Sequence, residues 1–231
     1  MRGGTLIIGE RKKLDDIYAR VKDLKKVLVA GCNGCVAICY AGGEKEVGLL
    51  ASELRILAKK DGKPLEVSEL THVRQCEHEF AEASRAAVEA VDAVICLGCG
   101  EGVQIMAEHF PGRVFLPGIN TTFIGSPDKQ GVWSEKCAAC GNCVLDRTGG
   151  VCPIARCSKS LLNGPCGGSH DGKCEVRDEL PCAWQLIYDR LKDQNRLEEL
   201  ETVWEPKDWR TSRDGGCRKI TREDMVAEKN G

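Results

Sequence analysis

Residues 137–157 read CAACGNCVLDRTGGVCPIARC and contain five of the fifteen cysteines of this 231-residue chain. Three more cysteines follow closely, at Cys166, Cys174 and Cys182. The surrounding sequence is rich in glycine, proline and asparagine, so it has little apolar material for a core. Cysteines two residues apart can place their thiolates around one metal centre without straining the chain. We therefore predict that residues 123–182 form a cysteine-rich, loop-dominated module that binds metal.

A disulfide framework is the alternative explanation for so many cysteines, and it fits poorly. The number of cysteines is odd, and the chain is long enough to bury a hydrophobic core without cross-links. The first residues lead through a brief apolar run into charged residues, unlike a secretory leader. We therefore expect a cytoplasmic protein whose thiols are reduced and free to bind metal.

The overall composition argues against nucleic acid or a membrane as a partner. The formal net charge is −2, which gives no basic surface for nucleic acid or anionic lipid. Aromatic residues make up 5% of the chain, too few for a platform that stacks bases. No apolar stretch approaches the roughly 18 residues that a membrane-spanning helix needs.

Residues 1–122 alternate short apolar runs with amphipathic stretches. The runs at residues 27–30, 65–67, 93–96 and 114–116 have the composition of buried strands. The segments between them carry apolar residues at helical spacing. This alternation predicts an α/β fold with a small, doubly wound parallel sheet of the Rossmann-like kind.

Cysteines follow three of the predicted strands, and parallel strands bring their carboxyl ends to one edge, where ligands bind. Cys32, Cys35 and Cys39 follow the first strand, Cys76 the second and Cys99 the third. A single four-thiolate site needs only four of these five cysteines. We expect the spare thiol to be Cys32, because it is closest to its strand.

The loop module offers eight further candidate ligands. The spacing of its first three cysteines is similar to a bacterial ferredoxin run and favours [4Fe–4S] clusters, although structural zinc also accepts four thiolates. We expect two to three metal sites in the chain, with zinc as the alternative at one of them, and their grouping stays open. The eight candidates are Cys137, Cys140, Cys143, Cys152, Cys157, Cys166, Cys174 and Cys182.

The remaining cysteines have simpler explanations. Cys96 lies inside an apolar run and is expected to be a packed core thiol. Cys217 lies alone in a polar tail and is expected to be a surface thiol. Residues 183–231 should begin with a helix, because Trp184, Ile187 and Leu191 form an apolar stripe, and should end in a polar docking tail.

Several segments together resemble one protein family. They are CAACGNC at residues 137–143, LLNGPCGG at residues 161–168 and GCNGCVAICYAGGEKEV at residues 31–47. They resemble the family named for the C-terminal domain of methylenetetrahydrofolate reductase, which as a separate chain is the MetV-like subunit of that enzyme in acetogens and related anaerobes. The resemblance extends from about Leu24 to Trp209.

The resemblance implies a partner and a role. The partner is a MetF-like flavoprotein that reduces methylenetetrahydrofolate in one-carbon metabolism of the acetyl-CoA pathway. The role is that of a non-catalytic iron–sulfur subunit of this oxidoreductase complex, which passes electrons from an electron-donor protein or complex to the flavin. The sequence has no recognisable flavin or folate motif, in keeping with such a role. A zinc-thiolate protein acting in methyl transfer, or as a structural adaptor, is the alternative.

Overall fold

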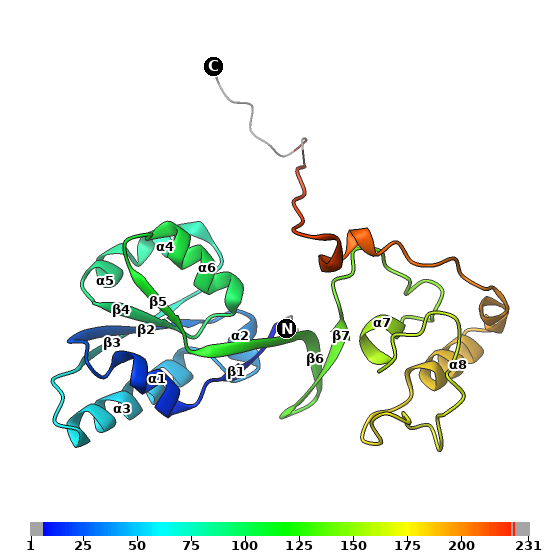
Figure 1. Cartoon of the computed structure of the whole chain (residues 1–231), viewed down its shortest axis with the longest axis horizontal. Helices are drawn as coiled ribbons and strands as arrows, with labels where there is room; N and C mark the ends of the chain where they lie inside the picture. The colour runs from blue at the N-terminus through cyan, green and yellow to red at the C-terminus, as the bar shows by residue number, and fades with distance from the viewer. Residues whose placement is uncertain (1–6, 223, 225–231) are drawn as a thin grey trace. The chain divides into compact units, whose positions relative to one another are not determined.

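The fold is taken from a computed structural model, and the structure describes residues 7–222 and 224. The chain divides into two compact units, residues 1–135 and residues 136–231 (Figure 1). We describe each unit separately. The domain boundary that we expected after residue 122 falls inside a strand of the first unit.

A four-stranded parallel sheet forms the centre of the first unit, with the order β3-β2-β4-β5. The two inner strands, β2 and β4, are nearly continuous apolar runs, as expected where a sheet is covered on both faces. The predicted parallel α/β sheet is therefore confirmed. Its strands are β2 (Lys26–Cys32), β3 (Glu66–His72), β4 (Ala93–Cys96) and β5 (Val114–Pro117).

Helices cover both faces of this sheet (Figure 1). On one face, α1 (Leu14–Val21) and α3 (Glu44–Lys60) pack against β2 through an apolar cluster that includes Leu50 and Leu54. The helices of the other face pack around Met106. These helices are α4 (His78–Ala83), α5 (Arg85–Glu89) and α6 (Gly100–His109), and the short α2 (Cys35–Ile38) follows β2.

The sequence predicted one helix where the structure has α4 and α5. The break lies at Ser84, which is buried and whose hydroxyl donates a hydrogen bond to the carbonyl of Ala81 at 2.7 Å. Serine side chains that bond to nearby backbone in this way compete with the helical pattern. The apolar residues therefore keep their helical spacing across Ser84, although the helix is interrupted there.

A second sheet, which the sequence did not predict, has the order β1-β6-β7. Its strands are β1 (Ile7–Arg11), β6 (Ile119–Lys129) and β7 (Val132–Cys137), and β1 runs antiparallel to β6. Much of β6 is exposed and polar, so its sequence lacks the apolar run that identifies a buried strand. This sheet extends the first unit past residue 122.

The second unit has little regular structure, as expected. Its helices are α7 (Pro153–Arg156), α8 (Ala183–Asp193) and three short 3₁₀ helices, η1 (Leu197–Glu201), η2 (Trp209–Thr211) and η3 (Arg213–Gly215). The predicted apolar stripe on α8 is confirmed, because Trp184, Ile187 and Leu191 are all buried. They form a small core with Val151 and Cys182. In the described part of the chain, no helix combines the length and apolar character needed to cross a bilayer.

We predict that Leu54→Ala destabilises the first unit, because Leu54 is fully buried between α3 and the sheet. The expected loss in free energy of unfolding is about 2–5 kcal/mol. The matched control is Ile56→Ala on the same helix, where 67% of the side chain is exposed and the change should stay within about 0.5 kcal/mol. Urea unfolding followed by circular dichroism measures both, and equal losses would contradict the assigned burial.

Candidate metal centres

Three strand ends bring cysteines to the carboxyl edge of the parallel sheet. Cys32 is the last residue of β2 and pairs in register with His72, the last residue of β3. The backbone N–H of Asn33 donates to the carbonyl of His72 at 2.9 Å, which ties the two strand ends together. Cys76 lies in the loop after β3, and Cys99 is the N-cap of α6 after β4. The local structure therefore places these cysteines on loops anchored by buried strands.

The electrostatics of Cys76 show which of these thiols interact. Burial raises the pKa of the Cys76 thiol, and the neighbouring Cys32 and Cys99 thiols raise it further, whereas Arg74 lowers it. Thiolates that lie together repel one another, and a bound cation removes this repulsion. Cys32, Cys76 and Cys99 thus form a group whose chemistry suits a metal.

Cys39 and Cys32 are placed differently from our expectation. The Cys39 thiol is buried beside β1, where its sulfur accepts a hydrogen bond from the backbone N–H of Gly9 at 3.4 Å and donates to the carbonyl of Val36 at 3.5 Å. Burial raises its pKa. The structure therefore places the Cys39 thiol near Cys35, at the start of α2, and places Cys32 near Cys76 and Cys99, with which it forms the edge group.

Cys96 occupies the place that the sequence predicted. It is fully buried in the core between the sheet and the helices of the second face. Burial raises the pKa of its thiol to about 12. A neutral thiol enclosed by apolar side chains is a packing residue, since the thiolate is the form that binds metal.

Gln75, which sequence reasoning missed, holds the edge group in place. Its side chain is fully buried, and its Nε2 donates to the carbonyls of Ala30 at 2.8 Å and Gly31 at 3.2 Å. A Cβ atom at Gly98 would lie 2.0 Å from its Oε1, and one at Gly102 would lie 2.8 Å from its Cβ. These two glycines therefore make room for the side chain next to Cys76. In the sequence, these glycines were the signal that could have revealed the buried side chain, because they fit no phosphate-binding motif.

His72 is a second buried polar residue at this edge. Its Nδ1 lies 3.3 Å from the carbonyl oxygen of Gly31, and its Nε2 has no hydrogen-bond partner among the described residues. Burial lowers the pKa of the imidazole. His72 is therefore a neutral, enclosed side chain that pairs in register with Cys32.

Four cysteines of the second unit line one small cavity. They are Cys157, Cys166, Cys174 and Cys182. Cys157 is the residue that ends α7, and Cys182 is the N-cap of α8. Four thiols are the number of donors that a tetrahedral zinc ion or a cubane cluster requires. The structure thus supplies a grouping that spacing alone left open.

Polar side chains around this cavity favour thiolates. The hydroxyl of Ser158 lies 3.3 Å from the sulfur of Cys174, and this hydrogen bond is the main cause of the lowered pKa of that thiol. Lys159 and Glu175 form an ion pair that also lines the cavity. Because the thiolate is the metal-binding form, a lowered pKa prepares the site for metal.

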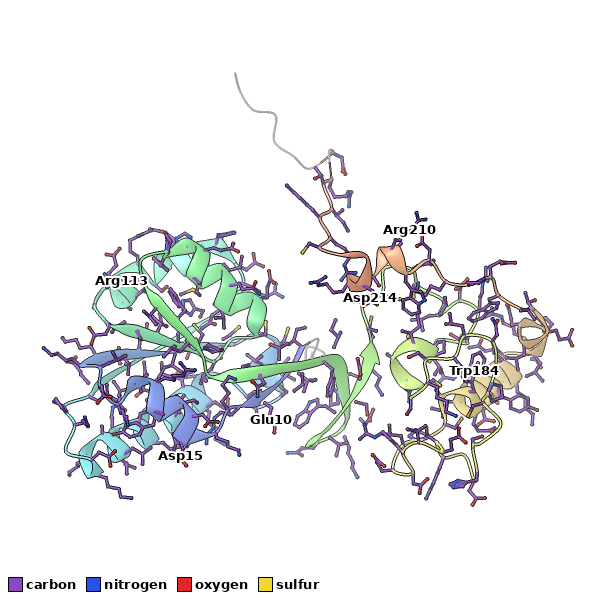
Figure 2. All side chains as sticks on the ribbon, in the orientation of Figure 1. Glu10, Asp15, Arg113, Trp184, Arg210 and Asp214 are labelled. Carbon is purple, nitrogen blue, oxygen red and sulfur yellow. The ribbon has the colours of Figure 1, made fainter. Side chains whose placement is uncertain are left out.

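Trp184 shields the same cavity on one side. The side chain extends from α8 among the loops of the second unit (Figure 2). Its indole N–H donates to the carbonyl of Leu161 at 3.0 Å, which fixes the ring. The ring lines both the cysteine cavity and a neighbouring, largely apolar cavity of about 410 Å³. The indole therefore forms part of the wall between the thiols and the apolar cavity.

The loop that contains the first three cysteines of the module follows β7. Ala139 and Gly141 adopt left-handed backbone conformations, with φ of 51° and 80°. The backbone N–H of Ala139 donates to the sulfur of Cys137 at 3.3 Å. Turns of this kind direct backbone N–H groups toward an anion and recur at iron–sulfur sites. Cys140 and Cys143 complete the loop, which we define as the cysteine loop, residues 137–143.

Cys152 is placed apart from the four-cysteine cavity. It is the N-cap of α7, and its sulfur accepts a hydrogen bond from the backbone N–H of Ala155 at 3.5 Å. Across residues 7–222 and 224, no three His, Cys, Asp or Glu side chains are arranged to hold a metal ion. The thirteen cysteines predicted as ligands therefore remain predictions. Their support is chemical, because the edge group and the four-cysteine cavity offer thiols of the kind that bind metal.

A comparison with known families gives one match. The family described as "Methylene-tetrahydrofolate reductase C terminal" matches residues 116–210, a stretch that includes all eight cysteines of the loop module. This match confirms the resemblance over residues 116–210, whereas the segment at residues 31–47 lies outside it. Neither the curated proteins nor the solved structures gave a significant match.

We predict that Gly98→Ala destabilises the edge of the sheet, because the added methyl would meet the amide of Gln75. Overpacking of this kind should lower the free energy of unfolding by about 1–3 kcal/mol. The control is Gly112→Ala, where a Cβ would meet nothing within 4 Å, so stability should be unchanged or raised by less than about 1 kcal/mol. Thermal or urea unfolding measures both variants, and a Gly98→Ala protein as stable as the control would show that Gln75 is not confined there.

Proposed function

Because residues 116–210 belong to the methylenetetrahydrofolate reductase C-terminal family, we propose that this chain is an iron–sulfur electron-transfer subunit of a methylenetetrahydrofolate reductase complex. In this complex it passes electrons to the flavin of a MetF-like catalytic subunit. The observation that carries the proposal is that four of the cysteines within the family match line a single cavity.

Three groups of thiols would hold metal in this proposal. The edge group of the first unit comprises Cys32, Cys76 and Cys99, to which the sequence adds Cys35 as a fourth candidate, and the cavity of the second unit has its own four cysteines. The cysteine loop supplies three more. Iron–sulfur clusters bound at such thiolates accept and donate single electrons.

The surrounding residues of this chain would tune each group. The Ala139 backbone N–H donates to the sulfur of Cys137, and the Ser158 hydroxyl lies beside the sulfur of Cys174, whose pKa it lowers. Trp184 supplies an apolar wall on one side of the cavity. Hydrogen bonds to sulfur and solvent exposure are the means by which proteins set the potential of such sites.

The reduction itself is assigned to the partner. The sequence contains no recognisable flavin or folate motif, whereas the matched family is named for a reductase whose reaction requires both. A flavin takes up two electrons, so a donor that delivers electrons singly needs a relay. The thiolate groups of this chain suit that relay, with an electron-donor protein or complex on its other side.

The second candidate function is a zinc-thiolate protein that acts in methyl transfer or as an adaptor. The four-cysteine cavity favours it, because structural zinc accepts the same four thiolates. Only five residues between Cys137 and Cys182, all of them described, are buried, so either metal would support folding of this segment. The identity of the bound metal therefore separates the two functions.

We predict that the protein purified without oxygen is brown and contains iron and sulfide, because its thiolate groups hold clusters. Cys166→Ser and Cys76→Ser should each remove about four iron atoms per chain, since each disrupts one site. Cys96→Ser is the control and should keep all the iron, because Cys96 is enclosed in the core. Iron and sulfide assays with visible absorbance measure these outcomes, and a colourless, zinc-containing protein would contradict the electron-transfer role.

We predict that this chain alone does not reduce methylenetetrahydrofolate, whereas its complex with the flavoprotein does so with a low-potential electron donor. Stopped-flow spectroscopy of the flavin, with and without this chain, measures the rate of flavin reduction. The Cys166→Ser variant in the complex should slow flavin reduction, while Cys96→Ser should not. Equal rates with and without this chain would place it off the electron path.

A further inference from the structure

The largely apolar cavity beside the four cysteines has a fixed rim. We define residues 197–206, which follow α8, as the rim segment, and five of them line the cavity. The side chain of Asn163 holds this segment through the backbone of Trp204. Its Nδ2 donates to the Trp204 carbonyl at 3.0 Å, and its Oδ1 accepts from the Trp204 backbone N–H at 2.7 Å. The cavity of about 410 Å³ is therefore a formed part of the second unit.

Apolar side chains at the mouth of this cavity are exposed. Tyr188 on α8 and Leu200 on η1 both line the cavity and both reach the surface. Val203, which also lines it, is 82% exposed. Exposed apolar side chains gathered around a hollow with a polar border are typical of an interaction site. The cavity therefore has the apolar character of a docking site.

The rim segment is strongly acidic. It contains four glutamates and neither lysine nor arginine. Glu199 pairs with Arg196, just outside the segment. The other three, Glu198, Glu201 and Glu205, are exposed and form no ion pair with any residue that the structure describes. Charge complementarity therefore favours an occupant whose apolar side chain is flanked by basic residues.

The tail of this chain has that chemistry. Residues 218–222 read RKITR, so one isoleucine lies among three basic residues. Among the large apolar residues that the structure describes, Ile220 is the most exposed, at 87%, and Val203 is the next. Lys219 forms no ion pair with any described residue. The two most exposed of these apolar side chains therefore lie in segments of opposite charge.

Hydrogen bonds hold the tail on the cysteine loop of its own chain. The Thr211 hydroxyl donates to the carbonyl of Cys140 at 2.9 Å, and Nη1 of Arg218 donates to the carbonyl of Ala139 at 2.7 Å. The lining of the apolar cavity contains no residue of the tail. Ile220 follows the last of these attachments by two residues, so it lies outside the cavity of its own chain and is accessible to another molecule.

We propose that the apolar cavity binds residues 219–222 of a second copy of this chain, with Ile220 as the side chain that enters it. The glutamates of the rim segment attract the basic residues beside Ile220. Each copy carries both surfaces, so two copies exchange their tails and close as a symmetric dimer. This inference goes beyond the proposed function and does not depend on which metal the cysteines bind.

The basic residues of the tail also suit the exposed apolar mouth of the cavity. Lysine and arginine lay their aliphatic stems along apolar surface while their charged ends stay in water. Lys219 would cover the exposed side chains of Tyr188 and Leu200 in this way and leave its ammonium near the glutamates. Attraction between exposed charges is screened by salt, so the dimer should weaken as the salt concentration rises.

Sedimentation velocity of the full chain, purified without oxygen and kept reduced, tests the proposal over a series of protein concentrations. We expect a reversible dimer, which Ile220→Ser weakens by roughly tenfold or more, because this side chain no longer leaves water on association. Val203→Ser should weaken it as well. The matched control is Ile56→Ser, an exposed position on α3 of the first unit, which should leave the dimer unchanged. A chain that stays monomeric, or a dimer that Ile220→Ser does not weaken, would overturn the proposal.

Charge reversal tests whether the two segments face each other. Glu198→Lys with Glu201→Lys should weaken the dimer, and so should Lys219→Glu with Arg222→Glu. All four substitutions in one chain should restore association, because opposite charges meet again. A fourfold variant that associates no better than either pair would contradict the assigned contact. Circular dichroism shows that each variant keeps its secondary structure, as expected for exposed positions.

Photochemical cross-linking identifies the occupant of the cavity. Benzoylphenylalanine in place of Ile220, in an equal mixture with chains that carry heavy nitrogen, should link to the rim segment or α8 of the other copy. Mass spectrometry separates links between copies from links within one chain, and links within one chain alone would overturn the proposal. Links to the MetF-like flavoprotein in place of the second copy, in the reconstituted complex, would also overturn it. Iron content and flavin reduction test the proposed function separately, so neither result would touch that function.

Discussion

The second unit has few apolar side chains to bury, and this shortage constrains the rest of its structure. Of the described residues between Cys137 and Cys182, only five are buried, and the small core around Trp184 lies largely on α8. Hydrophobic burial is the main favourable term in folding, so a segment this poor in it requires another source of stability. Under the function proposed above, metal bound by its cysteines would supply that stability.

The first unit, by contrast, has enough apolar side chains to enclose its sheet. Its parallel sheet is enclosed on both faces by apolar clusters, so the strands form a rigid frame without metal. The edge group lies on loops that begin directly at the ends of these strands. Gln75 connects the loop of Cys76 to the end of β2, so the thiols are positioned by the scaffold rather than by each other.

The two units therefore illustrate two ways to build a thiolate site. In the first, buried polar contacts position the cysteines of the edge group, and Cys39 and Cys96 are buried. In the second, loops with left-handed turns and hydrogen bonds to backbone carbonyls bring the ligands together. The family match covers the second kind of site, which agrees with a role that is carried by the cysteine-rich module.

Sequence alone determined the features that are encoded locally. The apolar runs predicted β2, β3, β4 and β5, the helical stripe predicted α8, and the setting of Cys96 predicted its burial. Each depends on neighbouring residues, and periodicity reports which face of an element is buried.

Only the tertiary structure decided which thiols share a site. Cys39 turns into the core because β1, thirty positions earlier at Gly9, offers its backbone to the sulfur. Gln75 is confined by glycines more than twenty positions later, and Arg218 donates to the carbonyl of Ala139 from the far end of the second unit's sequence. The periodicity of the sequence did not predict β6, because this strand is largely exposed and polar. Its strand conformation is fixed by pairing with β1. The direction of a side chain at a turn depends on contacts that are distant in sequence, and spacing does not contain them.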